Sequence, residues 1–541
     1  MSRTDLNYLG IEFLASIVSV ARVWATILFA ILAGWLMSYV AIKHEVFENV
    51  YISAIEVFES VPVISFFPIV LVLFVSYLGV PGVEMAVLFL VLTATAWNIW
   101  MGQYQAFKTV PKDLIEVAEN LRFDFWDKMT KVYIPYSIPR IASNLLPSFS
   151  DGLFYITVSE VFSVGSSQYS VFGIGSLIAG FTASGDYAQA LQSLGVLGVV
   201  VVVNVLAITK FADYAISKYG FETESTKVKR RGKVRAGLSA KASATASRVV
   251  KVARFTPLRG RSYVFLEEEE EGSPRRFKLT VGKAYTILGA SLILIAGVPI
   301  YVYREQVMQA LPYTPQILIA LAFDYVRVAV VTLVALALAV FGGYFLATHP
   351  KVEKPAIAFL QTFSAIPATA YFPLLYLATY TIVYPAFGPL APEFYVVLLA
   401  FISTFYYVFY EVWLGIKNIP KPVWELMDNL EMGFWARLRK IILPGVLPYM
   451  VTGLSSTINS AWGGLAVTEY WPNIVQGRDL QVSHGLMLYF ALWNAQGNVE
   501  LLAWGSFVFG AIVTIYSILF TRKLMDLSRK KYVMEESVYL V

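Results

Sequence analysis

Four ionisable residues stand within or at the ends of long apolar stretches of this sequence. They are two arginines and two glutamates: Arg22, Arg327, Glu160 and Glu469. A charge at the centre of a lipid bilayer costs about 2.5–3.5 kcal/mol on insertion scales, so two matched pairs indicate a role. We expect the glutamates either to line a gate or solute pathway or to reach water at the membrane surface. The arginines either attract an anion, which a guanidinium binds well, or extend to the interface.

Most catalytic chemistry is excluded by the residue types present. The sequence has no cysteine, so disulfides, thiolate metal sites and cysteine nucleophiles are ruled out. Its histidines are scattered, which disfavours a metal site. No G-x-x-x-x-G-K-[ST] phosphate-binding loop is present, because Gly282-Lys283 is followed by alanine and lacks the upstream glycine. We therefore expect no catalytic residue, metal or cofactor on this chain, and any ATP and Mg²⁺ would be bound by a separate polypeptide.

The elements that must position these charges are membrane-spanning helices. Apolar residues make up 57% of the 541 and charged residues 15%, with a mean hydropathy of +0.63. Runs of about 20 apolar residues recur, as a helix needs to cross a bilayer. They lack the period-two alternation of barrel strands. The sequence predicts an all-α polytopic protein of about 11 spans, near 13–42, 60–79, 83–106, 141–163, 189–210, 284–302, 316–347, 357–381, 393–416, 446–470 and 499–520.

An internal duplication relates the two halves. The repeated segments, residues 111–139 and 420–448, align without a gap at an offset of 309, and ten of 29 positions are identical. Glu160 and Glu469 share that offset. FESVPVISFFP (58–68) aligns with FSAIPATAYFP (363–373) at an offset of 305, as does Arg22 with Arg327. Pro62 and Pro367 in this pair are expected to kink helices that line a pathway.

The parity of the spans predicts the domain organisation. Each repeat has five spans, and an odd number of spans ends on the opposite side of the membrane. A second repeat that followed directly would therefore be inverted relative to the first. One extra helix restores a parallel arrangement, which transporters are known to use. We predict a first repeat at 1–217, a linker at 218–280, a junction helix at 281–310 and a second repeat at 311–541.

Positive charge in the loops predicts the orientation. Residues 218–278 carry sixteen Lys and Arg against seven Glu, and the C-terminal tail adds five more basic residues. Both regions, and both repeated segments, should be cytoplasmic, with the N-terminus outside. KVKRRGKVR (227–235) resembles a site for nucleic acid or anionic lipid, but a solvated connector is favoured, and we expect no nucleic-acid partner.

The repeated segments resemble the EAA loop of type I ABC importer permeases, which has the pattern E-A-A-x-x-x-G and a later aliphatic-Leu-Pro ending. EVA at 116–118 leads to IP at 134–135, and ELM at 425–427 leads to ILP at 442–444. Arg122 and Glu431 stand where the family has glycine, which puts the bend in question, and Gly433 lies two positions later. AWGGLAVTEY (461–470) and FGIGSLI (172–178) resemble the nitrate/sulfonate/taurine branch in a fused, duplicated form.

The resemblance implies which residues meet an ATPase. Its coupling helix docks in a groove on the ATPase subunit, which assigns that contact to Glu116, Ala118, Asn120, Leu121, Phe125, Trp126, Pro135, Glu425, Asn429, Leu430, Gly433, Phe434, Trp435 and Pro444.

The resemblance predicts a multi-pass permease in the cytoplasmic membrane of a prokaryote. It would supply both membrane halves, bind two ABC ATPase copies and an extracytoplasmic solute-binding protein besides lipid, and import a small anionic solute by alternating access. Nitrate, sulfonates, taurine and bicarbonate fit, as do neutral pyrimidines. The alternative is an ATP-independent secondary transporter with parallel repeats, whose coupling charges belong at midplane rather than at span ends. A membrane enzyme would need a convergent catalytic set, which is not visible.

Overall fold

The computed structural model describes residues 3–60, 70, 74–75, 77–79, 81–164, 167–219 and 304–516. The first half contains α1 (Arg3–Lys43), α2 (Glu45–Ser60), α4 (Pro81–Lys108), α5 (Lys112–Asn120), α6 (Phe125–Lys128), η2 (Met129–Tyr133), α7 (Ile134–Ser159), β1 (Val161–Val164), β2 (Ser167–Ser170), α8 (Ile174–Ser184) and α9 (Tyr187–Tyr219).

The second half contains α13 (Arg304–Ala310), η3 (Leu311–Tyr313), α14 (Thr314–Thr348), α15 (Pro350–Ala365), α16 (Ala368–Phe387), η4 (Gly388–Leu390), α17 (Ala391–Lys417), α18 (Lys421–Asn429), α19 (Phe434–Arg437), η5 (Leu438–Ile442), α20 (Leu443–Thr468), β3 (Tyr470–Val475), β4 (Arg478–Gln481), α21 (Leu486–Ala495) and α22 (Val499–Tyr516).

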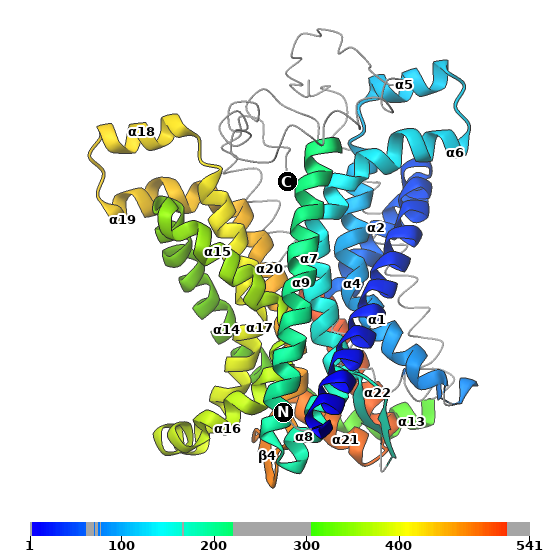
Figure 1. Ribbon diagram of the computed structural model, residues 1–541, viewed down its shortest axis with the longest axis vertical. Helices are drawn as coiled ribbons and strands as arrows, with labels where there is room; N and C mark the ends of the chain where they lie inside the picture. Colours follow the sequence, from blue (N-terminus) through cyan, green and yellow to red (C-terminus); the bar gives the residue numbers. More distant parts are fainter. Residues whose placement is uncertain are drawn as a thin grey trace.

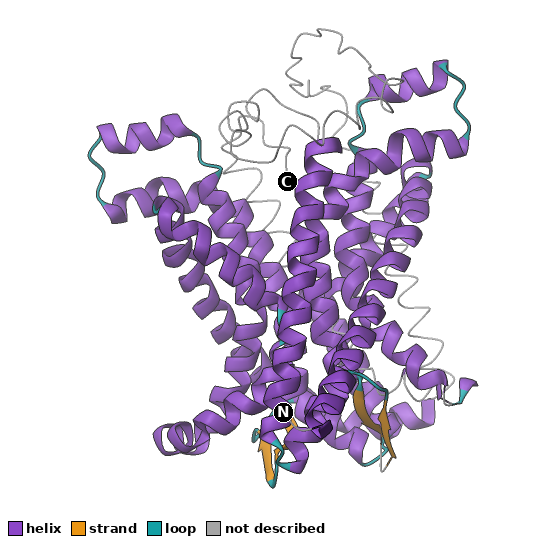
Figure 2. Cartoon of the chain, in the orientation of Figure 1, coloured by secondary structure: helices purple, strands orange, loops and turns teal. Residues whose placement is uncertain are grey.

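The protein is an all-α polytopic membrane protein, and helices dominate both halves (Figure 2). Within the described residues, six helical stretches are long and apolar enough to cross a membrane: Tyr8–Lys43, Pro81–Lys108, Tyr187–Tyr219, Val307–Thr348, Ala368–Lys417 and Phe434–Thr468. Each exceeds the roughly 20 residues that a bilayer requires.

The two halves repeat the same order of elements in parallel. The long helices α1, α4, α7 and α9 correspond to α14, α17, α20 and α22, and even the π-helical turns η2 and η5 fall at the 309-residue offset. Both repeated segments lie at one end of the molecule, which we call the segment end, and the hairpins lie at the other, the hairpin end (Figure 1). Helix α1 begins at the hairpin end, on the opposite side from the repeated segments (Figure 1).

Small residues allow the long helices of each half to pack closely. A Cβ on Gly464 of α20 would lie 2.7 Å from the Ala400 backbone of α17, and one on Gly453 would lie 2.6 Å from the backbone of Val408. Backbones that approach this closely gain van der Waals contact, which drives helix association where lipid removes the hydrophobic effect. α17 therefore packs tightly between α14 and α20, as α4 does between α1 and α7.

Two predicted spans differ from the observed elements. The span expected at 357–381 is two helices, because α15 ends at Ala365 and α16 begins after Pro367. Proline disfavours helical geometry at the preceding residue, and Ile366 has an extended ψ of 120°. The span expected at 141–163 ends at Ser159, where a β-hairpin follows.

Several other expectations lie outside the described residues. They are Pro62 and most of the span at 60–79, the linker at 218–280 apart from its first two residues, which end α9, and the junction helix at 284–302.

Candidate functional site

Each repeated segment folds as two short helices joined by a bend, and a longer helix then returns into the bundle. In the first copy these are α5, α6 and α7, and in the second α18, α19 and α20 (Figure 1). The first short helix is strongly amphipathic and buries one side chain at the equivalent place in both copies, Ala118 at 2% exposure and Met427 at 0%. Ile115 and its equivalent Trp424 are half-buried against the bundle, and most of the other described side chains of this helix are exposed.

The bends are closed by the same hydrogen-bond pattern in both copies. Phe123 N donates to Ala118 O at 2.9 Å and Arg122 N to Glu119 O at 2.9 Å. Met432 N and Glu431 N donate to the equivalent carbonyls at 3.1 and 3.0 Å. This is the Schellman arrangement, which normally uses a left-handed glycine to end a helix.

Arg122 and Glu431 occupy that left-handed position, with φ of 53° and 48°. The family bend is therefore kept without its glycine, at a cost of about 1–2 kcal/mol for each non-glycine residue. Gly433 does not replace it, because its φ is −66° and it instead precedes the first turn of α19. The equivalent residue of the first copy is Asp124. Its side chain caps α6 by accepting a hydrogen bond from Asp127 N at 2.7 Å.

Matched side-chain contacts hold the short helices together. Arg437 Nη1 lies 2.7 Å from Asp428 Oδ1, and Arg437 Nε donates to Met432 O at 2.6 Å across the bend. At the equivalent positions of the first copy, Lys128 Nζ lies 3.9 Å from Glu119 Oε1. These pairs were not predicted from the sequence, although both members share the 309 offset.

Each repeated segment contains a phenylalanine followed by a tryptophan. The phenylalanine packs against the bundle, and the tryptophan is exposed. Phe125 packs edge-on against Tyr39 at 5.0 Å between ring centroids, and Phe434 packs edge-on against the equivalent Tyr344 at 5.3 Å. Trp126 and Trp435 remain 70% and 63% exposed.

Most of the residues predicted to dock an ATPase lie on the surface of the segments. The exposed ones include both glutamates, both asparagines and both leucines, namely Glu116, Glu425, Asn120, Asn429, Leu121 and Leu430. Ala118 is buried, and Pro135 and Pro444 are the second residues of α7 and α20, directly after the π-helical turns η2 and η5.

The paired arginines and glutamates meet in two buried clusters near the hairpin end. The first ionic cluster consists of Ser19, Arg22, Glu84 and Glu160 from α1, α4 and the end of α7. Arg22 Nη1 lies 3.1 Å from Glu160 Oε1, and Arg22 Nη2 donates to Glu84 Oε2 at 3.0 Å. Glu160 is 0% exposed, so it does not reach water.

The second ionic cluster repeats this geometry with Asp324, Arg327, Glu393 and Glu469. Arg327 Nη1 donates to Glu469 Oε1 at 2.9 Å, and its other nitrogens donate to Glu393 at 2.7 and 2.8 Å. Asp324 replaces Ser19 at the 305 offset and lies 2.9 Å from the same Arg327 nitrogen. Arg327 is therefore enclosed by three carboxylates and is 4% exposed.

Each cluster caps the short helix that follows the hairpin. Glu160 Oε2 accepts from Gly175 N at 2.7 Å and Ser19 Oγ accepts from Ile174 N at 3.0 Å, at the start of α8. At the start of α21, Glu469 and Asp324 accept from Leu488 N at 3.0 Å and Leu486 N at 2.9 Å. Free N–H groups and the helix dipole both favour a carboxylate there.

Two glycines make room for these carboxylates. A Cβ on Gly173 would lie 2.0 Å from Glu160 Oε1, and one on Gly485 would lie 2.1 Å from Glu469 Oε2. Neither glycine provides a side-chain cap of its own, so part of each cap comes from a residue far away in the chain, Ser19 in the first half and Asp324 in the second. Glu84 and Glu393 were missed from the sequence, although they share the 309 offset.

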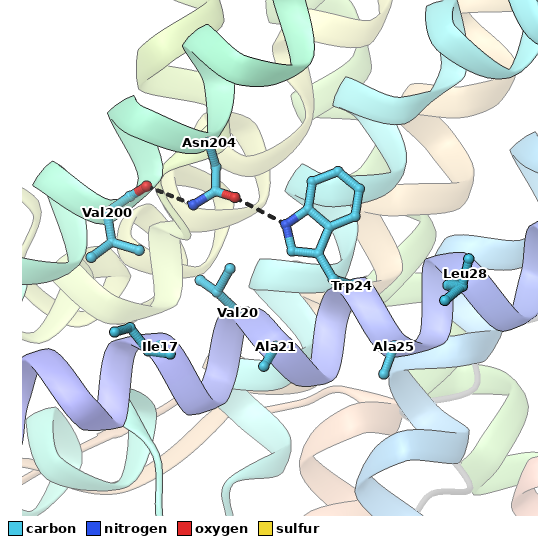
Figure 3. A pocket seen from close by; sticks show the side chains of 8 residues that line it. All are labelled: Ile17, Val20, Ala21, Trp24, Ala25, Leu28, Val200 and Asn204. Atoms are coloured by element: carbon cyan, nitrogen blue, oxygen red, sulfur yellow. Dashed lines mark hydrogen bonds between the residues drawn. The ribbon is translucent and has the colours of Figure 1, made fainter. Parts of the chain in front are cut away.

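A groove of about 490 Å³ lies on the outer faces of α1 and α9 (Figure 3). Its one amide, Asn204, is satisfied, since Oδ1 accepts from Trp24 Nε1 at 2.9 Å and Nδ2 donates to Val200 O at 2.8 Å. The remaining lining is apolar and includes Leu28, which is 58% exposed. The groove suits contact with lipid and offers no charged group to a solute.

The fold and these sites define a class: a helical membrane protein made of two parallel repeats, each with a surface segment at one end and a buried ionic cluster near the other. The chain belongs to the family described as "Binding-protein-dependent transport system inner membrane component", which it matches over residues 27–218 and again over 335–533. The two matches show that the chain is a fused, duplicated member of this transport family.

The chain also resembles part of one curated relative. The chain is 30% identical over 73 residues to the "Putative aliphatic sulfonates transport permease protein SsuC" of Bacillus subtilis (strain 168). The match covers 14% of this chain and spans about a quarter, 26%, of that relative.

Proposed function

We propose that this chain is the complete membrane-spanning part of an ATP-driven ABC importer, with both halves in one polypeptide. The observation that carries the proposal is the matched pair of bent surface segments at one end of two parallel repeats (Figure 1). Each segment presents a tryptophan that is more than 60% exposed on one short helix and an exposed glutamate on the other. Two equivalent surfaces held by one chain suit a partner that is itself a symmetric dimer.

The partner in this proposal is a pair of ATPase subunits that bind ATP and Mg²⁺. Exposed apolar residues surrounded by charge are characteristic of protein-docking surfaces. Closing of the ATPase dimer would draw the two repeated segments together and shift the membrane halves between two states. The segment end would then be cytoplasmic, together with the C-terminus, and a solute-binding protein would meet the hairpin end.

We propose a small anion, in the class of sulfonates, nitrate or bicarbonate, as the solute. The similarity to a relative described as an aliphatic sulfonates permease supports this choice. Arg22 and Arg327 would not bind the anion directly, because carboxylates already occupy their guanidinium groups. The solute-binding protein would then determine most of the specificity for the solute.

The test is substitution of the exposed glutamates in both segments. Glu425 pairs only with Lys421 at 3.2 Å on the surface, and such pairs contribute about 0.2–1 kcal/mol, so Glu116→Ala/Glu425→Ala should fold normally. We expect the double variant to lose ATPase binding or to hydrolyse ATP without transport, as measured by co-purification and by ATPase assay in nanodiscs.

The control is Asp213→Asn, which neutralises an exposed carboxylate of α9 outside the repeated segments. It should leave both measurements unchanged. Unaltered assembly and coupling in the double variant would contradict the docking role. Solute uptake without any ATPase subunit would favour the secondary transporter instead.

A further inference from the structure

The β-hairpins and short helices at the hairpin end connect the two halves reciprocally. The first hairpin unit is β1, β2 and α8, and the second hairpin unit is β3, β4 and α21. α8 of the first half packs against β3 of the second, and α21 of the second packs against β1 of the first. The Gln476 side chain in the turn of the second hairpin reaches Gly185 at the end of α8, where a Cβ would meet it at 2.2 Å.

Other cross-repeat contacts lie close to these units. Thr157 of α7 and Thr369 of α16 share a hydrogen bond of 2.7 Å between their hydroxyls. A Cβ on Gly463 of α20 would lie 3.2 Å from Tyr155 Oη of α7. At the segment end, by contrast, α18 and α19 lie far to one side of α5 and α6 (Figure 1). The halves thus converge at the hairpin end and diverge toward the segment end.

The ionic clusters attach each hairpin unit to its own half. Glu160 O accepts from Val171 N at 3.1 Å, just after β2, and Arg22 Nη1 donates to Phe172 O at 2.8 Å. In the second half Glu469 O accepts from Val482 N at 3.1 Å, and Arg327 Nη2 donates to His484 O at 2.5 Å. The end of each hairpin and the start of its short helix are therefore bound to the helices that carry the cluster.

No described contact of either cluster crosses to the other half. The partners of Arg22 and Glu160 all lie in the first half, and those of Arg327 and Glu469 all lie in the second. The units they support make the crossing contacts instead. Full burial and occupied hydrogen-bonding groups leave the glutamates no capacity to bind a passing solute.

We propose that the two ionic clusters are positioning elements for a gate at the hairpin end. Each cluster makes its hairpin unit move as part of its own half. The reciprocal contacts α8–β3 and α21–β1, together with the nearby α7–α16 contact through Thr157 and Thr369, form the closed gate. When the segment ends approach, the halves separate at the hairpin end and these contacts break together. This inference rests on the proposed function, because it assigns the state with separated segments to the closed gate.

The absence of native cysteine makes the gate measurable by cross-linking. Thr157→Cys/Thr369→Cys replaces hydroxyls that lie 2.7 Å apart, so the two sulfurs fall within disulfide reach. In the full chain with its ATPase subunits in nanodiscs, we expect copper phenanthroline to cross-link this pair efficiently without nucleotide. ATP with vanadate should lower the yield several-fold.

Glu160→Gln in this cysteine background tests the positioning role. We expect the variant to assemble with the ATPase, to lower the nucleotide-free cross-link yield several-fold and to raise basal ATP hydrolysis, because its hairpin unit is no longer fixed to α7. The matched control is Glu48→Gln, which breaks the 2.6 Å pair with Lys108 outside both hairpin units. It should leave the cross-link yield unchanged.

Unchanged cross-linking and ATP hydrolysis in a folded Glu160→Gln variant would overturn the proposal. If that variant does not fold, Glu469→Gln is measured in the same way, and failure of both to fold would show that the clusters are merely structural. A cross-link that responds to Glu160→Gln but not to ATP would count against the proposed function and leave the positioning role standing.

Discussion

Single residues in this protein show how a charge is retained inside an apolar bundle. Arg22 faces two carboxylates and Arg327 faces three, and each arginine also donates to a backbone carbonyl. A buried ion pair gains little net stability because both charges lose their hydration, but removal of one partner is costly. The clusters therefore favour one arrangement of α1, α4 and α7, and of their counterparts.

The high cost of removing one partner from a buried ion pair gives a prediction for the first ionic cluster. Arg22→Met leaves Glu160 fully buried without its cation, so the free energy of unfolding should fall by about 3–5 kcal/mol. Arg22→Met/Glu160→Gln should recover much of that loss, since no buried charge remains and the amide oxygen can still accept from Gly175 N. Thermal unfolding in detergent measures both variants, and a double variant no more stable than the single one would contradict the prediction.

At the scale of elements, the bend in each repeated segment is set by backbone hydrogen bonds rather than by a glycine. Arg122 and Glu431 hold positive φ because the Schellman pattern and the flanking contacts stabilise the turn. The same turn in two copies with different side chains shows that the geometry of the segment, and not the residue type, is what the duplication has kept.

A substitution at Arg122 should separate the contribution of the backbone hydrogen bonds from that of the residue type at the bend. Arg122→Gly removes the left-handed penalty of about 1–2 kcal/mol and adds back about 0.5–1 kcal/mol of chain entropy. We expect a net gain of about 0.5–1 kcal/mol, whereas Arg122→Val should loosen the segment. Hydrogen exchange of the α5 and α6 amides measures both.

Gly433→Ala is the control for the bend, since Gly433 has φ of −66° and a Cβ added there would meet no atom within 4 Å. It should leave exchange in α18 and α19 nearly unchanged. Faster exchange in Arg122→Gly than in the unsubstituted chain would contradict the account of the bend.

At the scale of the whole molecule, the duplication places two equivalent bent segments at one end of a single chain. A long helix connects each segment to the hairpin unit of the same half (Figure 1). Interfaces between packed halves have discrete arrangements, so movement at one end can be transmitted to the other.

The stoichiometry follows from this arrangement. One copy of the chain should bind two ATPase subunits, and native mass spectrometry of the purified complex measures that ratio. Glu425→Ala alone should release or weaken one of the two subunits, because only the second segment is altered. A complex with one chain and one ATPase would contradict the proposed docking at both segments.

The sequence alone established the features that depend on local composition and on the duplication. Apolar runs of spanning length predicted the helical membrane fold, and the offsets of 305 and 309 paired Arg22 with Arg327 and Glu160 with Glu469. These patterns are readable because a helix and its repeat are encoded in adjacent residues.

Only the tertiary structure decided how the paired residues are used. Arg22 meets Glu160 across 138 positions of the chain, and Ser19 caps α8 across 155, and no local pattern encodes such contacts. The hairpin after Glu160 was hidden in an apolar stretch that equally suits a helix. Burial and ion pairing, which decide between a solute-binding charge and a structural one, exist only when distant helices pack together.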